Sequence, residues 1–103
     1  MYRRPSDFRK NVREKTWSRA EQEHGGIVRD EVTGAPKSKD QPWDMGHKPG
    51  FEFRKHQISA ADRQISRKQF LNEHDNPDHY RPELPKSNRG HSGEDASDLW
   101  LGP

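Results

Sequence analysis

The stretch from Trp43 to Gly50, Trp-Asp-Met-Gly-His-Lys-Pro-Gly, constrains the fold more than any other part of this chain. Its first residues are typical of a short strand, and Pro49-Gly50 predict a sharp turn directly after it. His47 is therefore expected at the end of a strand, where the bend fixes its ring. A second stretch, Tyr80 to His91, is typical of a proline-containing edge strand followed by a short helix. We predict that the two stretches fold against each other.

Few apolar residues are available to hold such an arrangement together. The chain has 103 residues, of which 25% are hydrophobic and 35% are charged. Three Trp, four Phe and two Tyr must therefore supply much of the core of one small domain. The absence of cysteine excludes disulfides, cysteine-based zinc knuckles and thiol nucleophiles. No apolar run reaches membrane-spanning length and the start does not resemble a signal peptide, so no membrane insertion is expected.

The charge balance is compatible with nucleic-acid binding. The formal net charge is +2 and the sequence pI is near 9.0. Lysines and arginines alternate with acidic residues and do not form a polybasic tail. This mild basicity permits contact with nucleic acid without demonstrating it.

Local signals predict the remaining elements. Ser66 and Gln69 have the spacing of a capping box, which predicts a helix over residues 66–74. Residues 51–56 fit either a strand or the start of a helix, and residues 59–64 fit a helical turn. The apolar end of the tail, at 99–101, is expected to pack back on the domain. The other predicted elements are a helix over 6–24 capped by Ser6, strands at 27–30, 43–47 and 80–84, a turn at 31–34 bonded to Asp30, a polar loop at 35–42 and a helix over 85–92.

Several side chains in the two stretches suit the hydrolysis of a phosphodiester. This reaction needs a base near the attacking water and a cation near the phosphate. His47 is the candidate base, since imidazole titrates near neutral pH. Asn88 and His91 are three residues apart, so a helix would place them on one face, with His91 as a metal ligand and Asn88 bonded to a neighbouring loop. Glu83 offers a carboxylate to a hard cation, and Asp44 is a candidate outer ligand.

Each of these residues also has an ordinary structural interpretation. A histidine at a bend can be a hydrogen-bonded structural residue, Asn88 can belong to a polar turn, and Glu83 can be a solvated charge. Three basic residues flank the candidate site and are expected to contact phosphates without reading bases: Lys48, Arg81 and Arg89. The remaining histidines are interpreted as surface or structural residues: His24, His56, His74 and His79.

Together, Trp43–Gly50 and Tyr80–His91 resemble the GH-E family, a branch of the HNH/endonuclease VII superfamily named for a Gly, a His and a Glu. The resemblance covers roughly residues 27–95. It implies an α+β fold: a small single domain over residues 1–103 with a ββα-metal core, at about 27–95, plus flanking helices.

The resemblance also implies roles for particular residues. Gly46 and His47 match the family's Gly-His, with His47 as general base. Asn88 and His91 match the Asn-x-x-His of the final helix. Glu83 is assigned as the family's Glu, and the competing assignments are Glu52 and Glu73.

The sequence departs from most HNH enzymes at two points. They usually carry a metal-binding Asp or His just before the catalytic His, where this chain has Gly46. Glu83 is therefore expected to replace the missing ligand. Some relatives carry a zinc knuckle, in place of which this chain is expected to have the hydrogen-bonded turn from Asp30 to Gly34.

The family occurs as C-terminal toxin domains of bacterial polymorphic toxins. The resemblance implies a metal-dependent DNA endonuclease, with Mg²⁺ as the first choice of cation and Mn²⁺, Ni²⁺ or Zn²⁺ as alternatives. His47 would take a proton from water, and the ion on His91 and Glu83 would stabilise the leaving 3′ oxygen, giving 5′-phosphate and 3′-hydroxyl ends. A cognate immunity protein is implied, as is a secreted or translocated effector domain that acts in the cytoplasm of the target bacterium. The alternatives are a ribonuclease toxin of the same fold and a non-catalytic basic binding module.

Overall fold

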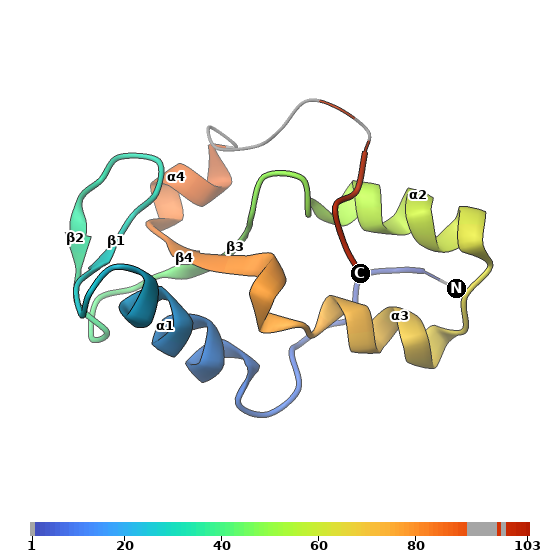
Figure 1. The fold of residues 1–103 in the computed structure, drawn as a ribbon, viewed down its shortest axis with the longest axis horizontal. Helices are drawn as coiled ribbons and strands as arrows, with labels where there is room; N and C mark the ends of the chain where they lie inside the picture. Colours follow the sequence, from blue (N-terminus) through green and yellow to red (C-terminus); the bar gives the residue numbers. More distant parts are fainter. Residues whose placement is uncertain (1, 91–96, 98) are drawn as a thin grey trace.

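A computed structural model of the chain describes residues 2–90, 97 and 99–103. This part is an α+β domain with four α-helices, one short 3-10 helix and two antiparallel sheets of two strands each (Figure 1). The elements in chain order are α1 (Val12–Glu23), β1 (Val28–Arg29), β2 (Pro36–Lys37), β3 (Asp44–His47), α2 (Phe53–Arg63), α3 (Arg67–His74), η1 (Pro77–His79), β4 (Tyr80–Glu83) and α4 (Pro85–Arg89).

The centre of the molecule is the antiparallel pair of β3 and β4, which are brought together although α2, α3 and η1 separate them in the chain. Its register places Asp44 opposite Glu83, Gly46 opposite Arg81, and His47 opposite Tyr80. The helix α4 follows β4 after Leu84 and contacts β3. The predicted pairing of the two stretches and the ββα order are therefore confirmed.

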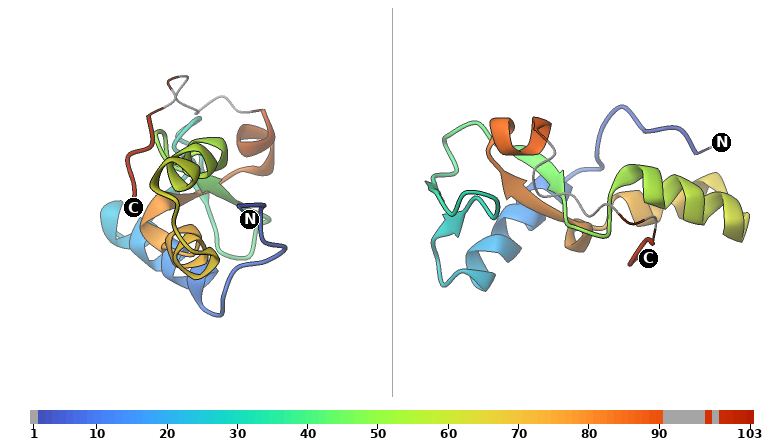
Figure 2. Two further views of the ribbon diagram at one scale, coloured as in Figure 1. Left: turned by 90° about the vertical axis from the view of Figure 1, so that its right-hand side faces the viewer. Right: turned by 90° about the horizontal axis from the view of Figure 1, so that it is seen from above.

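Two apolar clusters lie on either side of this strand pair. One consists of Trp17, Ala20, Val28 and Trp43, with Met45 packed against it. The other is formed by buried residues of α2 and α3, and it is supported by Tyr2, Ile65 and Leu71. Figures 1 and 2 show the corresponding lobes, with α1 and the β1–β2 hairpin on one side and α2 with α3 on the other. Aromatic side chains supply most of the buried apolar surface of both clusters, because the chain has few aliphatic residues.

The N-terminal helix is shorter than predicted. It begins at Val12, and residues 2–10 are not helical. Ser6 is therefore not its cap. The N-cap residue is Asn11, whose φ of 70° lies in the left-handed region that Asn tolerates better than most residues.

Three other predictions on secondary structure were wrong or incomplete. The predicted polar loop contains β2, where Lys37 pairs with Val28. The helix α2 extends from Phe53 to Arg63 and not only over one turn, because Phe53, His56 and Ala60 fall on one buried face at helical spacing. The helix α4 ends at Arg89, short of the predicted residue 92.

Local predictions of caps and packing were more accurate. The Ser66 hydroxyl accepts a hydrogen bond from the Gln69 amide at 3.1 Å, as the capping signal predicted. In the tail, Trp100 stacks on His56 with ring centroids 4.5 Å apart, and the Leu101 amide donates to the Gly50 carbonyl at 2.9 Å. Among the described residues, no helix is both long enough and apolar enough to cross a membrane.

Candidate functional site

Glu83 packs directly over the backbone of Gly46. A Cβ added to Gly46 would lie 2.8 Å from Glu83 Cγ and closer still to the carboxylate. Glu83 is only 4% exposed, and burial raises the pKa of its carboxyl against the opposing effect of Arg81, whose Nε lies 3.2 Å from Oε2. Residue 46 must therefore be glycine because a carboxylate occupies the space of its side chain.

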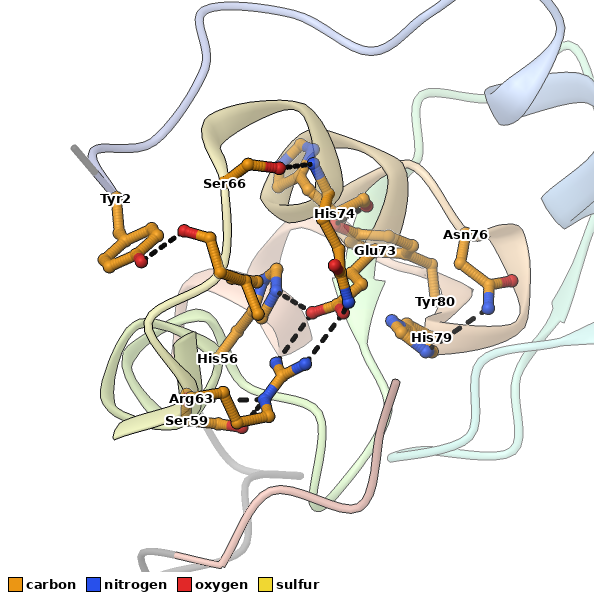
Figure 3. Close-up of polar contacts among 12 residues, drawn as sticks. Tyr2, His56, Ser59, Arg63, Ser66, Glu73, His74, Asn76, His79 and Tyr80 are labelled. Carbon is orange, nitrogen blue, oxygen red and sulfur yellow. Dashed lines mark hydrogen bonds and ion pairs between the residues drawn. The ribbon is translucent and has the colours of Figure 1, made fainter. Parts of the chain in front are cut away.

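The two competing glutamates are held in other networks. Glu52 accepts a hydrogen bond from the Gly50 amide at 2.9 Å and pairs with Lys55 at 3.0 Å. Glu73 accepts hydrogen bonds from both terminal nitrogens of Arg63, at 2.7 and 2.8 Å, and is 3.0 Å from His56 Nε2 (Figure 3). The bonds from Arg63 hold the pKa of Glu73 at about 2. Both glutamates have structural partners, whereas Glu83 is the one that contacts Gly46.

Asp44 connects β3 to α4. Its Oδ2 accepts a hydrogen bond from Asn88 Nδ2 at 3.1 Å and lies 3.3 Å from Arg89 Nε. Because Asp44 is directly opposite Glu83 in the antiparallel register, the two carboxylates lie on the same face of the strand pair. The structure thus brings together Asp44, Glu83 and Asn88, and Asn88 bonds to β3 where a bond to a neighbouring loop was expected.

His47 lies on the other face of the strand pair. The alternation of side chains puts it with Met45, away from Asp44 and Gly46, and its ring packs on Tyr80 with centroids 4.6 Å apart. Burial lowers the pKa of His47 to about 3, and the charge of Arg4 adds to this effect. The imidazole is therefore neutral at physiological pH and able to accept a proton.

Two adjoining cavities run beside β3. One, of about 240 Å³, is lined by His47, His74, Met45 and residues 4–8. The other, of about 520 Å³, is lined by Asp44, Met45 and Asn88 together with residues of the segment 7–14. Since both cavities include Asp7, Phe8 and Met45, they form one depression, which we name the β3 groove. His47 and Asn88 thus line a common groove at its two ends. Glu83 is not one of the described residues that line either cavity.

His74, which was interpreted from the sequence as a surface or structural residue, is buried and also lines the His47 end of the groove. Its Nδ1 lies 2.9 Å from the Asp75 carboxylate, and the residue is 5% exposed. Its backbone carbonyl accepts a hydrogen bond from the Tyr80 hydroxyl at 2.7 Å. Burial lowers the pKa of His74, although Asp75 opposes this effect. The sequence offered only the His-Asp dipeptide as a signal.

The three predicted phosphate contacts are each near a carboxylate. Lys48 Nζ lies 3.9 Å from Glu23. Arg81 pairs with Glu83 and Arg89 with Asp44, as described above. Arg81 and Arg89 are thus placed next to acidic members of the site, whereas Lys48 is near Glu23 of α1.

Asp30 fixes the start of α4 and was expected only to bond within its own turn. It accepts hydrogen bonds from the Thr33 amide and hydroxyl at 3.0 and 2.8 Å, as predicted. It also accepts from the Leu84 amide and the Ser87 hydroxyl, both at 2.9 Å. Burial opposes ionisation of Asp30, but these hydrogen bonds together lower its pKa. The turn from Asp30 to Gly34 therefore joins the hairpin to α4 through hydrogen bonds.

A divalent cation would find two hard oxygen donors here, the carboxylates of Asp44 and Glu83. Within the described ranges, no group of three or more His, Cys, Asp or Glu side chains is arranged to hold a metal ion. His91, the third predicted ligand, lies outside the described residues. The donor chemistry of the two carboxylates fits a hard cation.

An antiparallel strand pair with a histidine at the end of its first strand, followed by a short helix, is the arrangement of an HNH-like nuclease. A family model covers residues 25–94, and its description is GH-E: HNH/ENDO VII superfamily nuclease with conserved GHE residues. The chain therefore belongs to the GH-E family. Membership supports a nuclease function with a nucleic-acid substrate, and HNH/ENDO VII nucleases are generally metal-dependent. No solved structure matches the chain.

Proposed function

We propose that this chain is a metal-dependent endonuclease that hydrolyses DNA, and that Gly46, His47 and Glu83 are the family's conserved Gly, His and Glu. The observation that carries this proposal is the contact between Glu83 and Gly46, immediately before His47. It explains why a glycine precedes the histidine and why a glutamate is required on the partner strand. Glu52 and Glu73 have partners in other networks.

His47 is the proposed general base. Its neutral imidazole can take a proton from water as the water attacks phosphorus. The ring is held by Tyr80 and by its position at the end of β3, which limits its motion in the groove. A bound phosphate would favour the charged imidazolium, because an opposite charge nearby raises the pKa of a histidine. Substrate binding would therefore make His47 a stronger base than it is in the free chain.

Asp44, Glu83 and His91 are the proposed ligands of a divalent cation, with Mg²⁺ as the first choice. When bound, such an ion would neutralise charge that develops on the phosphate and on the leaving oxygen. Asn88 positions the Asp44 side chain through their hydrogen bond. Lys48, Arg81 and Arg89 remain the proposed phosphate contacts of this site.

We also propose that the chain acts as a toxin in the cytoplasm of a target bacterium, where it is delivered as an effector domain. A cognate immunity protein would protect the producing cell. Membership of the GH-E family is the support for these proposals.

The test compares the degradation of plasmid DNA and of total RNA by the wild-type chain and two variants. Each reaction is run with Mg²⁺, Mn²⁺, Ni²⁺, Zn²⁺ or excess EDTA. His47→Ala should abolish cleavage, whereas His24→Ala, which changes a histidine paired with Glu31 outside the groove, should not. EDTA should stop the wild-type reaction.

Each outcome has a distinct meaning. Full activity of His47→Ala would remove His47 as the base, and activity in EDTA would refute the metal requirement. Degradation of RNA with plasmid left intact would establish the ribonuclease alternative. No cleavage with any of the four metals would favour a non-catalytic binding module.

A further inference from the structure

The segment of residues 2–13 forms the outer wall of the β3 groove, although it precedes the family-matched residues 25–94. In Figure 1 it runs in blue from the N-terminus beside α3 to the start of α1. Residues 4–8 line the His47 cavity, and members of 7–14 line the cavity at Asp44 and Asn88.

This segment is packed against the domain. Phe8 stacks on His74 with centroids 5.0 Å apart and meets Tyr80 edge-on at 5.1 Å. Arg9 Nε lies 3.2 Å from the Asp75 carboxylate. The Tyr2 hydroxyl donates to the backbone carbonyl of residue 65. The wall of the groove is therefore held against residues 65–80.

Two arginines of the segment lie at opposite ends of the groove. The Arg4 guanidinium carbon is 4.4 Å from the Phe53 ring centroid, and Arg4 lines the His47 cavity. The Arg13 guanidinium carbon is 3.7 Å from the Trp43 ring centroid, and one of its terminal nitrogens donates to the Trp43 carbonyl at 2.6 Å. Both arginines are exposed. Stacking on a ring orients a guanidinium while its in-plane N–H groups remain able to donate to oxygen.

The positive charge in the groove is local. Asp7, Glu14 and Asp44 line it as well, so it is not a uniformly basic channel. The Asp7 carboxylate accepts a hydrogen bond from the Phe8 amide at 2.8 Å. Phosphates are therefore expected at the two defined points that Arg4 and Arg13 provide, and acidic residues disfavour other positions.

We propose that Arg4 binds the phosphodiester presented to His47 and that Arg13 binds a phosphate of the same strand further along the groove. The N-terminal segment would then be part of the substrate-binding site. The ligand class is the sugar-phosphate backbone, without reading of bases. This inference rests on the proposed nuclease function, but it is tested by binding alone.

The experiment measures binding of a short fluorescein-labelled DNA duplex by fluorescence anisotropy, over a range of NaCl concentrations. All proteins are the full chain with His47→Ala, in EDTA, so that the duplex stays intact. Arg4→Gln and Arg13→Gln are compared with Lys10→Gln, which removes an exposed charge of the same segment that lines neither cavity. Loss of one phosphate contact should reduce the slope of log K against log salt by about 0.9, which corresponds to a roughly eightfold weaker affinity at about 0.1 M salt.

Reduced slopes for both arginine variants, with an unchanged slope for Lys10→Gln, would support the proposal. An unchanged slope for either arginine variant, or an equal loss for Lys10→Gln, would overturn it. Arg13→Lys keeps the charge and should keep most of the slope, which separates a lost phosphate contact from a disturbed Trp43 packing. Failure of the nuclease function would instead appear as an uncleaved plasmid with the unmodified chain.

Discussion

Replacing Gly46 by alanine should displace the carboxylate of Glu83. The three heavy atoms nearest to an added Cβ all belong to Glu83, and Cγ would be 2.8 Å away. Ordinary contact between such atoms begins at 3.4 Å, so Cγ must move by roughly 0.6 Å and the carboxylate by more. Because the φ angle of Gly46 is not positive, alanine itself is compatible with the backbone. The substitution is therefore a test of the carboxylate position.

The expected effects differ in size for stability and for activity. Overpacking of this kind typically costs about 1–3 kcal/mol of the free energy of unfolding. A displacement of about 1 Å at a catalytic group can cost about 100-fold in rate, which is the loss we expect for plasmid cleavage. Glu83→Ala removes the obstructing side chain, so Gly46→Ala should cost little stability in that background. Urea unfolding of both single variants and the double variant measures this coupling.

Two results would refute this reasoning. A Gly46→Ala variant that cleaves at the wild-type rate would show that the carboxylate need not lie over residue 46. A double variant whose loss of unfolding free energy equals the sum of the losses in the two single variants would show that the two residues do not compete for space.

Three further predictions follow from buried polar groups. Asp30→Ala leaves four donors without their acceptor and should lower the free energy of unfolding by about 3 kcal/mol or more. Ser87→Ala removes one of these donors and should cost about 1 kcal/mol. Equal losses for the two variants in urea titrations would contradict the central role of Asp30. The acid limb of kcat/KM should lie well below pH 6.5, because His47 stays neutral in the free chain, and a limb at 6.5 would be inconsistent with its burial. The free energy of unfolding should also fall as pH drops from 7.5 to 5.5. Burial keeps four histidines neutral in the folded chain, but below pH 6.5 they take up protons in the unfolded chain, which costs up to about 1.4 kcal/mol per pH unit for each: His47, His56, His74 and His79. A constant free energy of unfolding over this range would contradict the lowered pKa values of these histidines.

The parts of the fold that the sequence predicted have local signals. Ser66 with Gln69 marks a helix start by side-chain chemistry within one turn, and Pro85 marks the start of α4 in the same way. The strand that ends at His47 is fixed by the bend after it. Such signals depend on neighbouring residues alone, so they can be interpreted without knowledge of the tertiary structure.

The parts that were missed depend on contacts between distant residues. Asp30 bonds to Leu84 and Ser87, which nothing in its own turn indicates. The choice among three glutamates required the β3–β4 register, which sets Glu83 over Gly46. The non-helical path of residues 2–10 is fixed by stacking of Phe8 on His74 across the groove.

The separation of His47 from the acidic residues also follows from the register. Strand alternation was visible in the sequence and places Asp44 on the parity of Gly46, opposite to His47. The predicted base and metal ligands are thus separated: His47 lines one end of the β3 groove and Asp44 the other, and Glu83 is not among the described residues that line either cavity. His91, the remaining predicted ligand, lies outside the described residues.

The most direct measurement is a crystal structure of the His47→Ala variant bound to a short DNA duplex and a divalent cation. We expect the sugar-phosphate backbone to lie in the β3 groove, with one phosphodiester beside residue 47 and the cation on the carboxylates of Asp44 and Glu83. A duplex bound on another face of the domain, with the groove free of phosphate, would contradict the assignment of this site.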